Sequence, residues 1–353
     1  MILESKSTPS KRQEKSRLKK LQDKSLSSDL LNVLIIGCGN IAGGLDSKKN
    51  KVGPPLSHAG SYSANPHFNI QACIDISAHR SKDFAKEWGI PEYYTSLDQA
   101  IRAGSCFDVI SICSPTECHF TDIIACLALS PKLIFCEKPV TGTVADTMKV
   151  KVACEQAGVL LAINYNRRWD KHVINLKREI KANERGALRS VVGYYNKGIL
   201  NNGSHLIDLL SFLIGDLVIN HVGRPDYDFF ENDPSIYVSL EAKNSVPVLL
   251  VPGAKAFDFS IFELQLIFED SMLLMLDGGM RWVERRVNSS DVFDGYLTLN
   301  SGVSIKGGYL ATMSNAVDNI WLALTKGHPL NSNVETALIA HSLCENIIKT
   351  SKH

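Results

Sequence analysis

Asn32-Val-Leu-Ile-Ile-Gly-Cys-Gly-Asn-Ile-Ala42 is the stretch that decides the fold of the first half of this chain. Residues 33–36 form an unbroken aliphatic run, which is typical of a strand buried on both faces of a parallel sheet. Gly37, Gly39 and Ala42 follow at the Gly-x-Gly-x-x-Ala spacing of a dinucleotide-binding turn, where the backbone must bend tightly and approach the phosphates. The N-terminus of the next helix then attracts the anion. Glycine-rich turns also follow strands for purely steric reasons, so the rest of the chain has to support a cofactor site.

Length and composition set the broad class. The chain has 353 residues, more than one hydrophobic core usually spans, so we expect two domains. A content of 44% hydrophobic and 21% charged residues is that of an ordinary globular protein. The formal net charge of +1 gives no general reason to expect nucleic acid as a partner, and no apolar run approaches the length of a membrane span. The nine cysteines include no Cys-x-x-Cys pair, which favours a reduced, cytoplasmic protein without a metal site.

Residues 1–30 differ in composition from everything after them. Up to Ser28, eight basic residues face three acidic ones, a formal charge of about +5. We expect a solvated, flexible or frayed helical arm. Contact with nucleic acid or a membrane, a transit peptide and docking on another subunit remain alternatives, whereas the lack of a following apolar segment argues against a secretory signal.

Strands and helices are expected to alternate between residues 31 and 164. Apolar strand-like runs lie at 33–36, 68–74, 109–113, 133–136 and 159–164. This order predicts a doubly wound parallel sheet whose strand ends open onto one crevice. A polar insertion interrupts the helix expected after Ala42, and we expect residues 57–64 to complete that helix.

The pattern changes between residues 165 and 334. Helical stretches at 171–183 and 204–213 flank a strand at 188–195. Six further strand-like runs lie at 219–222, 237–242, 246–251, 259–269, 272–276 and 281–286. Short polar turns between them predict an antiparallel sheet with helices on one face, an α+β arrangement. A last helix within residues 335–353 is expected to pack back on the first domain.

Asp75 ends the second expected strand, where a carboxylate can accept hydrogen bonds from the adenosine ribose hydroxyls. Its distance from the glycines exceeds the usual spacing of about 20 residues, and the insertion accounts for the excess. A carboxylate here repels a 2′-phosphate and favours NAD, whereas nearby Arg80 could bind that phosphate and keeps NADP possible. Asp75 could equally be a turn carboxylate at a strand end.

Glu137-Lys138-Pro139 follows the strand at 133–136 and is the first candidate for chemistry. A lysine partly desolvated beside an oxidised nicotinamide would have its pKa lowered toward the range useful for proton transfer. Pro139 would fix the backbone so that Lys138 points into the crevice. An exposed lysine paired with Glu137 is the plainer alternative.

His205 belongs to the second candidate cluster. His205 and Asp208 lie on one face of the expected helix, and Ser204 can cap it. A histidine beside a carboxylate can exchange a proton with a substrate hydroxyl or carbonyl. A histidine with only a structural role at a helix start fits the same pattern.

Five motifs in this order resemble the Gfo/Idh/MocA oxidoreductase family. They are Gly-x-Gly-x-x-Ala, strand-end Asp75, Ser114-Pro115 with His119, Cys136-Glu137-Lys138-Pro139, and Gly203-Ser-His-Leu-Ile-Asp208. The resemblance covers the chain from about Asn32 to its end. It implies a Rossmann domain and an open-faced antiparallel sheet that carries the substrate and commonly the oligomer interface, hence a homodimer or homotetramer. It also implies hydride transfer between NAD or NADP and a secondary alcohol or ketone of a sugar, polyol or nucleotide sugar.

The resemblance implies roles for single residues as well. Lys138 would hold the substrate hydroxyl and help to move its proton, and His205 would be the general acid/base. The implied substrate contacts are Tyr165, Asn166, Arg167, Asn201 and Asp208. The implied cofactor contacts are Gly37, Gly39, Asn40, Ile41, Ala42, Asp75, Arg80, Ser114, Pro115, Thr116, His119, Glu137 and Lys138.

One departure from the family pattern concerns Asn201. Many members have aspartate at this position, four residues before the histidine. An amide can hydrogen-bond a sugar but cannot buffer the charge on His205 or Lys138. A cofactor-binding regulatory or scaffold protein with a decayed active site is therefore a second hypothesis. The insertion lysines 48, 49 and 51 could meet a phosphorylated or nucleotide-linked sugar, or belong to a solvated loop.

Overall fold

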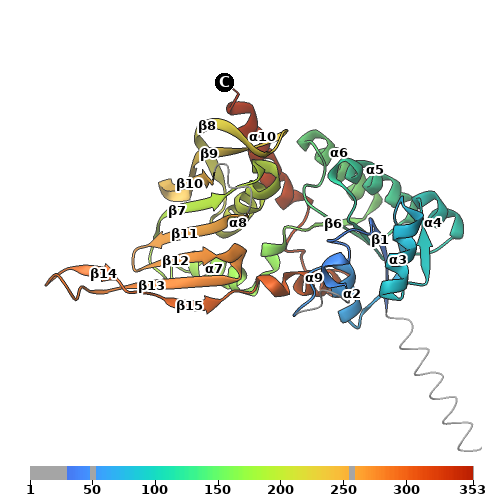
Figure 1. Ribbon diagram of the computed structural model, residues 1–353, viewed down its shortest axis with the longest axis horizontal. Helices are drawn as coiled ribbons and strands as arrows, with labels where there is room; N and C mark the ends of the chain where they lie inside the picture. Colours follow the sequence, from blue (N-terminus) through green and yellow to red (C-terminus); the bar gives the residue numbers. More distant parts are fainter. Residues whose placement is uncertain (1–29, 48–52, 254–258, 353) are drawn as a thin grey trace, which may run out of the picture.

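The computed structural model describes residues 30–47, 53–253 and 259–352, and shows two units that are each built around their own sheet (Figure 1). The predicted basic arm lies outside the described residues, except for Leu30 at its end, and so do Lys48, Lys49 and Lys51 of the insertion.

The first unit contains a six-stranded, all-parallel sheet in the order β3-β2-β1-β4-β5-β6. The strands are β1 (Leu31–Ile36), β2 (Phe68–Ile74), β3 (Glu92–Tyr94), β4 (Val109–Ile112), β5 (Leu133–Cys136) and β6 (Leu160–Ile163). The predicted doubly wound parallel sheet is confirmed. The order reverses direction between β1 and β4, so the crevice lies beside the glycine turn.

Helices cover both faces of this sheet. They are α2 (His58–Ala64), α3 (Ala78–Trp88), α4 (Leu97–Ala103), α5 (Thr116–Cys126) and α6 (Val144–Ala157). The residues of β1 alternate between two cores: Leu34 packs in the core that includes Ile123 of α5, and Val33 packs in the core that includes Phe84 of α3. A strand buried on both faces needs the continuous apolar run that β1 has.

The insertion divides the first helix as expected. The backbone N–H groups of His58 and Ala59 donate to the carbonyls of Ile41 (3.1 Å) and Ala42 (2.7 Å), so α2 continues the turn that the glycines begin. The carboxylate of Asp46 accepts from the two backbone N–H groups just before α2, at 2.9 and 2.7 Å. These hydrogen bonds connect the start of the insertion to its C-terminal end.

The second unit is a nine-stranded sheet in the order β14-β13-β12-β11-β7-β10-β9-β8, with β15 paired to β13. Its strands are β7 (Leu188–Tyr195), β8 (Leu217–Phe230), β9 (Asp233–Ala242), β10 (Val246–Pro252), β11 (Phe262–Phe268), β12 (Ser271–Leu276), β13 (Arg281–Ser289), β14 (Leu297–Leu299) and β15 (Val303–Lys306). The predicted antiparallel arrangement is confirmed for every pair except β7 and β10, which run parallel. β14 and β15 were not predicted, because they are short and largely exposed.

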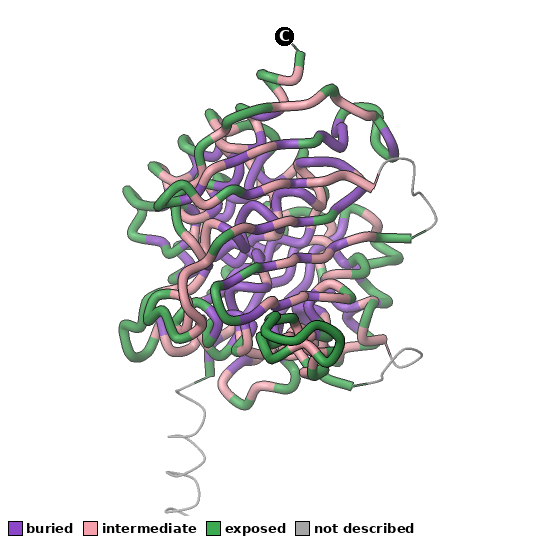
Figure 2. The backbone as a smooth tube through the Cα atoms, turned by 90° about the vertical axis from the view of Figure 1, so that its left-hand side faces the viewer, coloured by how far each residue is buried: buried purple, intermediate pink, exposed green. Residues whose placement is uncertain are grey.

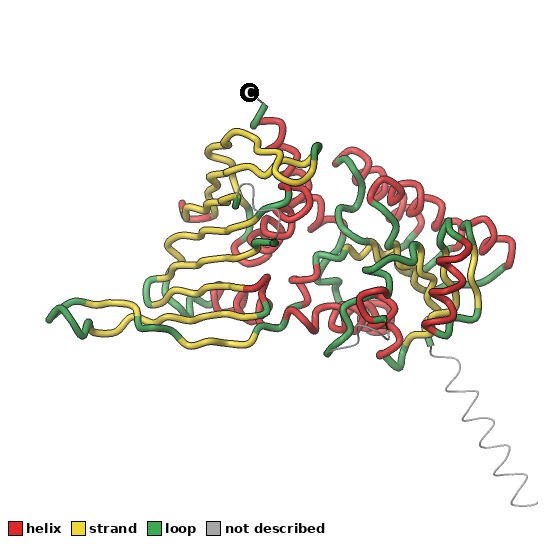
Figure 3. Tube along the Cα trace, in the orientation of Figure 1, coloured by secondary structure: helices red, strands yellow, loops and turns green. Residues whose placement is uncertain are grey.

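The helices of the second unit lie on one face of the large sheet (Figure 3), as predicted. They include α7 (Lys171–Lys181), α8 (Ser204–Ile214) and α10 (Val334–Thr350). Figure 2 looks onto the opposite face, where buried and partly exposed residues alternate along the strands. This period of two is what a sheet with one covered face requires.

Two C-terminal helices join the units. α9 (Thr312–Lys326), which was not predicted, buries Met313, Ala316 and Val317 in the core of the first unit. The helix predicted within 335–353 is present as α10 and contacts both α6 of the first unit and α8 of the second. The two sheets are therefore held against each other by helices from the end of the chain.

Candidate functional site

The glycine turn after β1 has the geometry that a dinucleotide requires. Gly37 has a φ of +85°, and a Cβ placed there would lie 2.7 Å from the backbone of Cys113 and Ser114 at the end of β4. Only glycine fits such a close approach. Gly39, by contrast, would have nothing within 4 Å of an added Cβ, so its backbone faces open space. One glycine is needed for packing, and the other leaves room for phosphates.

A groove of about 600 Å³ opens beside this turn, and its size fits the adenosine half of a dinucleotide. Its lining residues are Cys38, Gly39, Asn40, Gly44, Ser77, His79, Arg80, Asp83, Phe84 and Glu87. Of the predicted cofactor contacts, Gly39, Asn40 and Arg80 therefore share one groove.

Asp75 lies next to this groove and connects two of its lining segments. Its carboxylate accepts hydrogen bonds from the backbone N–H groups of Cys38 (3.0 Å) and Ser77 (2.9 Å). Nη1 of Arg80 lies 3.6 Å from the same carboxylate, and the arginine side chain is 62% exposed. Asp75 is therefore a turn carboxylate next to the groove, and Arg80 forms an ion pair with it while its side chain stays largely exposed.

His119 lies beneath the loops rather than in the groove. It is fully buried, with Nδ1 2.8 Å from the carbonyl of Pro139 and Nε2 2.8 Å from the carbonyl of Ser114. The loop residues Ser114, Pro115 and Thr116 lead directly into α5. His119 thus links the loops after β4 and β5, which differs from the direct cofactor contact that was expected of it.

Glu137 is an internal ion and not the partner of an exposed lysine. Its Oε1 accepts hydrogen bonds from Nε2 of His58 (3.0 Å) and Nδ2 of Asn164 (2.7 Å). Burial alone would raise the pKa of Glu137, but His58, Asn164 and the charge of Lys138 hold it below its usual value. Sequence reasoning missed both partners. Asn164 directly follows β6, so the rule that ligands meet strand ends could have found it.

Lys138 belongs to the first unit, and its side chain contacts the second unit. Its Nζ donates to the backbone carbonyl of Asn201 at 2.9 Å and to the side-chain Oδ1 of the same residue at 3.1 Å. Burial lowers the pKa of Lys138, while the charges of Glu137 and Asp233 oppose that shift. The structure thus brings together two predicted site residues that are 63 positions apart.

His205 lies on the first turn of α8, four residues after Asn201. Its ring packs edge-on against Tyr165, with centroids 5.5 Å apart, and against Phe262 at 6.4 Å. Burial, followed by the charges of Lys138 and Arg167, holds the pKa of His205 well below its usual value. Among the described residues, no hydrogen-bond partner occupies its ring nitrogens. His205 is therefore a neutral imidazole available to a ligand.

Asp208 does not orient His205. Both of its carboxylate oxygens accept from Nε of Arg168, at 2.8 and 2.9 Å, and both side chains are buried. The single Nε–H of Arg168 is shared between the two oxygens, in a charge-assisted and buried ion pair. The expected i, i+3 partnership on the helix face is replaced by an ion pair with the preceding segment.

Asn166 and Arg167 lie on a short 3-10 turn (Asn166–Trp169) after β6. The guanidinium of Arg167 donates to the carbonyl of Gly278 (2.9 and 3.1 Å) and covers the ring of Phe262 at 3.8 Å. Nδ2 of Asn166 donates to the hydroxyl of Tyr309 at 3.2 Å, whereas its Oδ1 is buried without a partner in the described part of the chain. Within the described residues, this acceptor is a buried polar atom without a hydrogen bond, which is uncommon in folded proteins.

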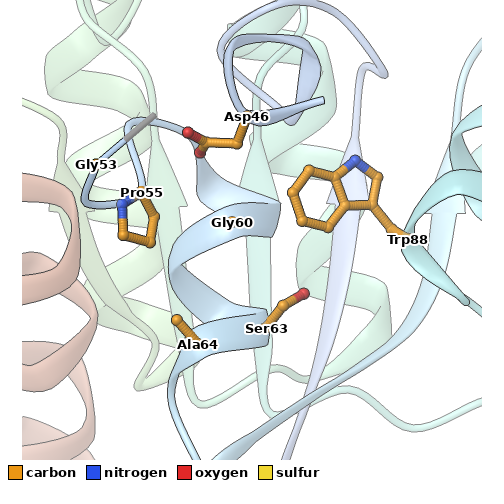
Figure 4. A pocket seen from close by; sticks show the side chains of 7 residues that line it. All are labelled: Asp46, Gly53, Pro55, Gly60, Ser63, Ala64 and Trp88. Atoms are coloured by element: carbon orange, nitrogen blue, oxygen red, sulfur yellow. The ribbon is translucent and has the colours of Figure 1, made fainter. Parts of the chain in front are cut away.

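A separate cavity of about 130 Å³ lies beside the insertion (Figure 4). It lies between α2, the insertion and Trp88 of α3, and Asp46 stands over Gly60. None of the predicted catalytic or substrate-binding residues lines it. In the described ranges, no group of three or more His, Cys, Asp or Glu side chains is arranged to hold a metal ion. No helix in these ranges has the length and apolarity needed to cross a membrane.

Comparison with known proteins agrees with this geometry. Residues 31–165 match the model of a family described as an oxidoreductase family with an NAD-binding Rossmann fold, GFO_IDH_MocA. An uncharacterized oxidoreductase of Bacillus subtilis, YrbE, is 37% identical over 129 residues, which cover 36% of this chain and 37% of the relative. The myo-inositol 2-dehydrogenase of Thermotoga maritima is 29% identical over 112 residues, covering 32% and 33% of the two chains. The matched segments thus span about a third of these relatives.

The similarity of fold extends over both units. A putative NADPH-dependent oxidoreductase from Desulfitobacterium hafniense superimposes with a TM-score of 0.75 at 16% identity, covering 92% of this chain and 96% of the other. A Rossmann sheet with a dinucleotide turn, joined to a large sheet with one covered face, is the fold that this chain shares with that protein. Over residues 31–165 the chain is similar to the Gfo/Idh/MocA oxidoreductase family.

Proposed function

We propose that the protein is an NAD(P)-dependent oxidoreductase that acts on a secondary alcohol, or the corresponding ketone, of a sugar, polyol or nucleotide sugar. The observation that carries the proposal is the hydrogen bonding of Lys138 to Asn201, near the ring of His205, whose nitrogens have no hydrogen-bond partner in the described part of the chain. The similarity to a protein named as a myo-inositol 2-dehydrogenase supports a polyol-like substrate.

The residues of the first unit would hold the dinucleotide. The phosphates would lie against the backbone of Gly39, and the adenosine ribose near Asp75. When bound, the nicotinamide supplies the position that accepts or donates the hydride. The buried carboxylate of Asp75 favours NAD, whereas Arg80 on the rim is the group that would accept the extra phosphate of NADP.

The substrate proton would pass through Lys138 and His205. A neutral imidazole can accept a hydroxyl proton, and the depressed pKa of His205 keeps it neutral at physiological pH. Lys138 would hold the substrate oxygen through its ammonium, and Asn166 would lie beside the substrate. Arg167, Tyr165 and Asn201 would complete the lining of the substrate site.

Asp208 has a different role in this proposal. Because its oxygens are bound by Arg168 in the interior, we assign it to the stability of α8 and not to substrate binding.

We further propose that the protein is cytoplasmic and forms a homodimer or homotetramer through the outer face of the large sheet. Apolar side chains exposed on β8 and β9 support this arrangement; they are Val218, Tyr227, Phe229, Phe230 and Tyr237. Light scattering coupled to size exclusion would contradict it by giving the mass of a single chain.

A substrate panel tests the proposal directly. Polyols, aldoses, sugar phosphates and nucleotide sugars would be incubated with NAD or NADP, and the absorbance of the reduced cofactor followed. We expect turnover with at least one member. Cofactor binding, measured separately by fluorescence, is the control. Intact cofactor binding without turnover on any member would reject the enzyme and favour the regulatory or scaffold alternative.

A further inference from the structure

We propose that Asp233 is a positioning residue of this active site, acting as the counter-charge that keeps Lys138 in place and maintains its ammonium form. The inference rests on the proposed function, because that function gives Lys138 its task. Asp233 begins β9, comes from neither motif around Lys138 or His205, and is 9% exposed.

The contacts of Asp233 lead directly to Lys138. One carboxylate oxygen accepts the backbone N–H of Leu200, and the other accepts the backbone N–H of Asn201, both at 2.8 Å. Asn201 in turn presents its carbonyl and Oδ1 to Nζ of Lys138. The carboxylate therefore binds the backbone of the π-helical turn Gly198–Gly203, and Asn201 of the same turn binds the lysine.

The turn is shaped around this carboxylate. Gly198 has a φ of +88°, and a Cβ added there would collide with Oδ2 of Asp233. A residue with a side chain would thus push the turn off the carboxylate, in addition to the strain of a left-handed conformation.

Among the described residues, Asp233 is one of two carboxylates whose charge acts on Lys138. A buried ammonium is unfavourable unless a carboxylate compensates it, and the atoms that Lys138 touches on Asn201 are neutral oxygens. The charged and titratable groups that act on Lys138 are Glu137, Asp233, Arg167, Cys344 and His205. Of the two carboxylates, Glu137 has the larger effect on the pKa of Lys138 and also binds His58 and Asn164. Asp233 is the carboxylate bound to the turn that Lys138 contacts.

Asp233 receives its hydrogen bonds from neutral backbone N–H groups, which do not cancel its negative charge. Burial raises the pKa of Asp233 overall, although the bonds from Leu200 and Asn201 and the charge of Lys138 oppose that shift. The charge of Asp233 in turn opposes the lowering of the pKa of Lys138 by burial. Asn201 cannot supply a carboxylate next to Lys138. Asp233, which accepts a hydrogen bond from the backbone of Asn201, supplies one instead.

The test measures the protonation of Lys138 without a substrate. Brief acetylation with acetic anhydride over a pH series, read by mass spectrometry of the peptide that contains Lys138, gives the pH at which the amine becomes reactive. Asp233→Asn keeps the shape and one acceptor oxygen. We expect it to move that midpoint down by about one pH unit, because a nearby negative charge is lost.

Asn201→Asp provides the rescue and a second independent variant. It places a carboxylate at the position that now lies 3.1 Å from Nζ. In the Asp233→Asn background it should return the midpoint toward the wild-type value, and alone it should raise the midpoint. If Asp233→Asn does not fold, Asn201→Asp alone tests whether a carboxylate next to Lys138 raises the midpoint.

Asp228→Asn is the matched control. Asp228 is equally buried in the adjacent strand and accepts from Ser235 and Lys197, but it is not among the groups that act on Lys138. It should leave the midpoint unchanged. An unchanged midpoint in Asp233→Asn, an equal shift in Asp228→Asn, or no upward shift in Asn201→Asp would overturn the inference. Failure of the substrate panel would not, since labelling needs no turnover.

Discussion

The two ends of the candidate site are built on different principles. The nucleotide end consists of backbone: a glycine that packs at 2.7 Å from β4, a glycine that faces open space, and an aspartate that binds two N–H groups. The substrate end consists of buried charged and titratable side chains, centred on Lys138 and His205, whose pKa values are shifted by burial and by one another. The nucleotide end depends on backbone shape, and the substrate end depends on the electrostatics of buried side chains.

The difference teaches where each kind of mutation should act. A change at the nucleotide end should alter cofactor affinity and leave chemistry intact, because no proton moves there. A change at the substrate end should alter turnover or stability, because each ion there is balanced by another in a water-poor setting. Variants at the two ends therefore test this difference.

The largest effect is expected for Lys138→Met. Loss of the ammonium should lower kcat by roughly 10²–10⁴-fold, the range for a residue that takes part in proton transfer. The Kd for NAD, measured by fluorescence, should stay within about twofold, and Lys132→Met on the same segment is the control because Lys132 is 60% exposed. Undiminished kcat in Lys138→Met would refute the assignment.

Asp208→Ala should destabilise the fold. Removing this carboxylate leaves Arg168 buried and unpaired, which typically costs about 3–5 kcal/mol. Urea unfolding measures the change in the free energy of unfolding. Glu184→Ala, which breaks the exposed pair with Arg178, should cost less than about 1 kcal/mol. If Asp208→Ala kept full stability but raised KM for the substrate, the carboxylate would belong to the substrate end after all.

His205→Asn should lower kcat by on the order of 10²-fold and alter the pH profile. In the wild type, the low pKa of His205 keeps the ring neutral as the pH falls through 6.5, so alcohol oxidation should persist below that pH. The variant should lose the acid limb of the pH–kcat profile that belongs to this ring. A wild-type acid limb at or above pH 6.5 would contradict a depressed pKa.

The smallest effect is expected for Asp75→Ala. Loss of the ribose acceptor and of the link to Cys38 should raise KM for NAD about tenfold, or about 1.4 kcal/mol, with a smaller rise for NADP. Asp83→Ala, which changes an exposed carboxylate lining the same groove, is the control. A large loss of kcat at saturating NAD would show that the two ends are not separable in this way.

Much of the fold follows from local patterns. β2, β5 and β7 begin and end at the predicted residues, because each is an apolar or alternating run bounded by polar residues. α9 was not predicted, although its buried residues Met313, Ala316, Val317 and Ile320 have the i, i+3, i+4, i+7 spacing of an amphipathic helix that the sequence already shows. The outermost strands β3 and β14 were also not predicted, because three residues carry too little periodicity.

The nucleotide end could be predicted from local sequence, because a strand, two glycines and an aspartate lie within about 45 positions and meet a local geometric need. The arrangement of the substrate end could not, because it forms only when distant segments fold together. Lys138 and Asn201 are 63 residues apart, Asp233 is a further 32 away, and His58 reaches Glu137 across 79. The reason is physical: backbone conformation is encoded by neighbours in the chain, whereas the balance of buried charges depends on side chains that only folding brings together.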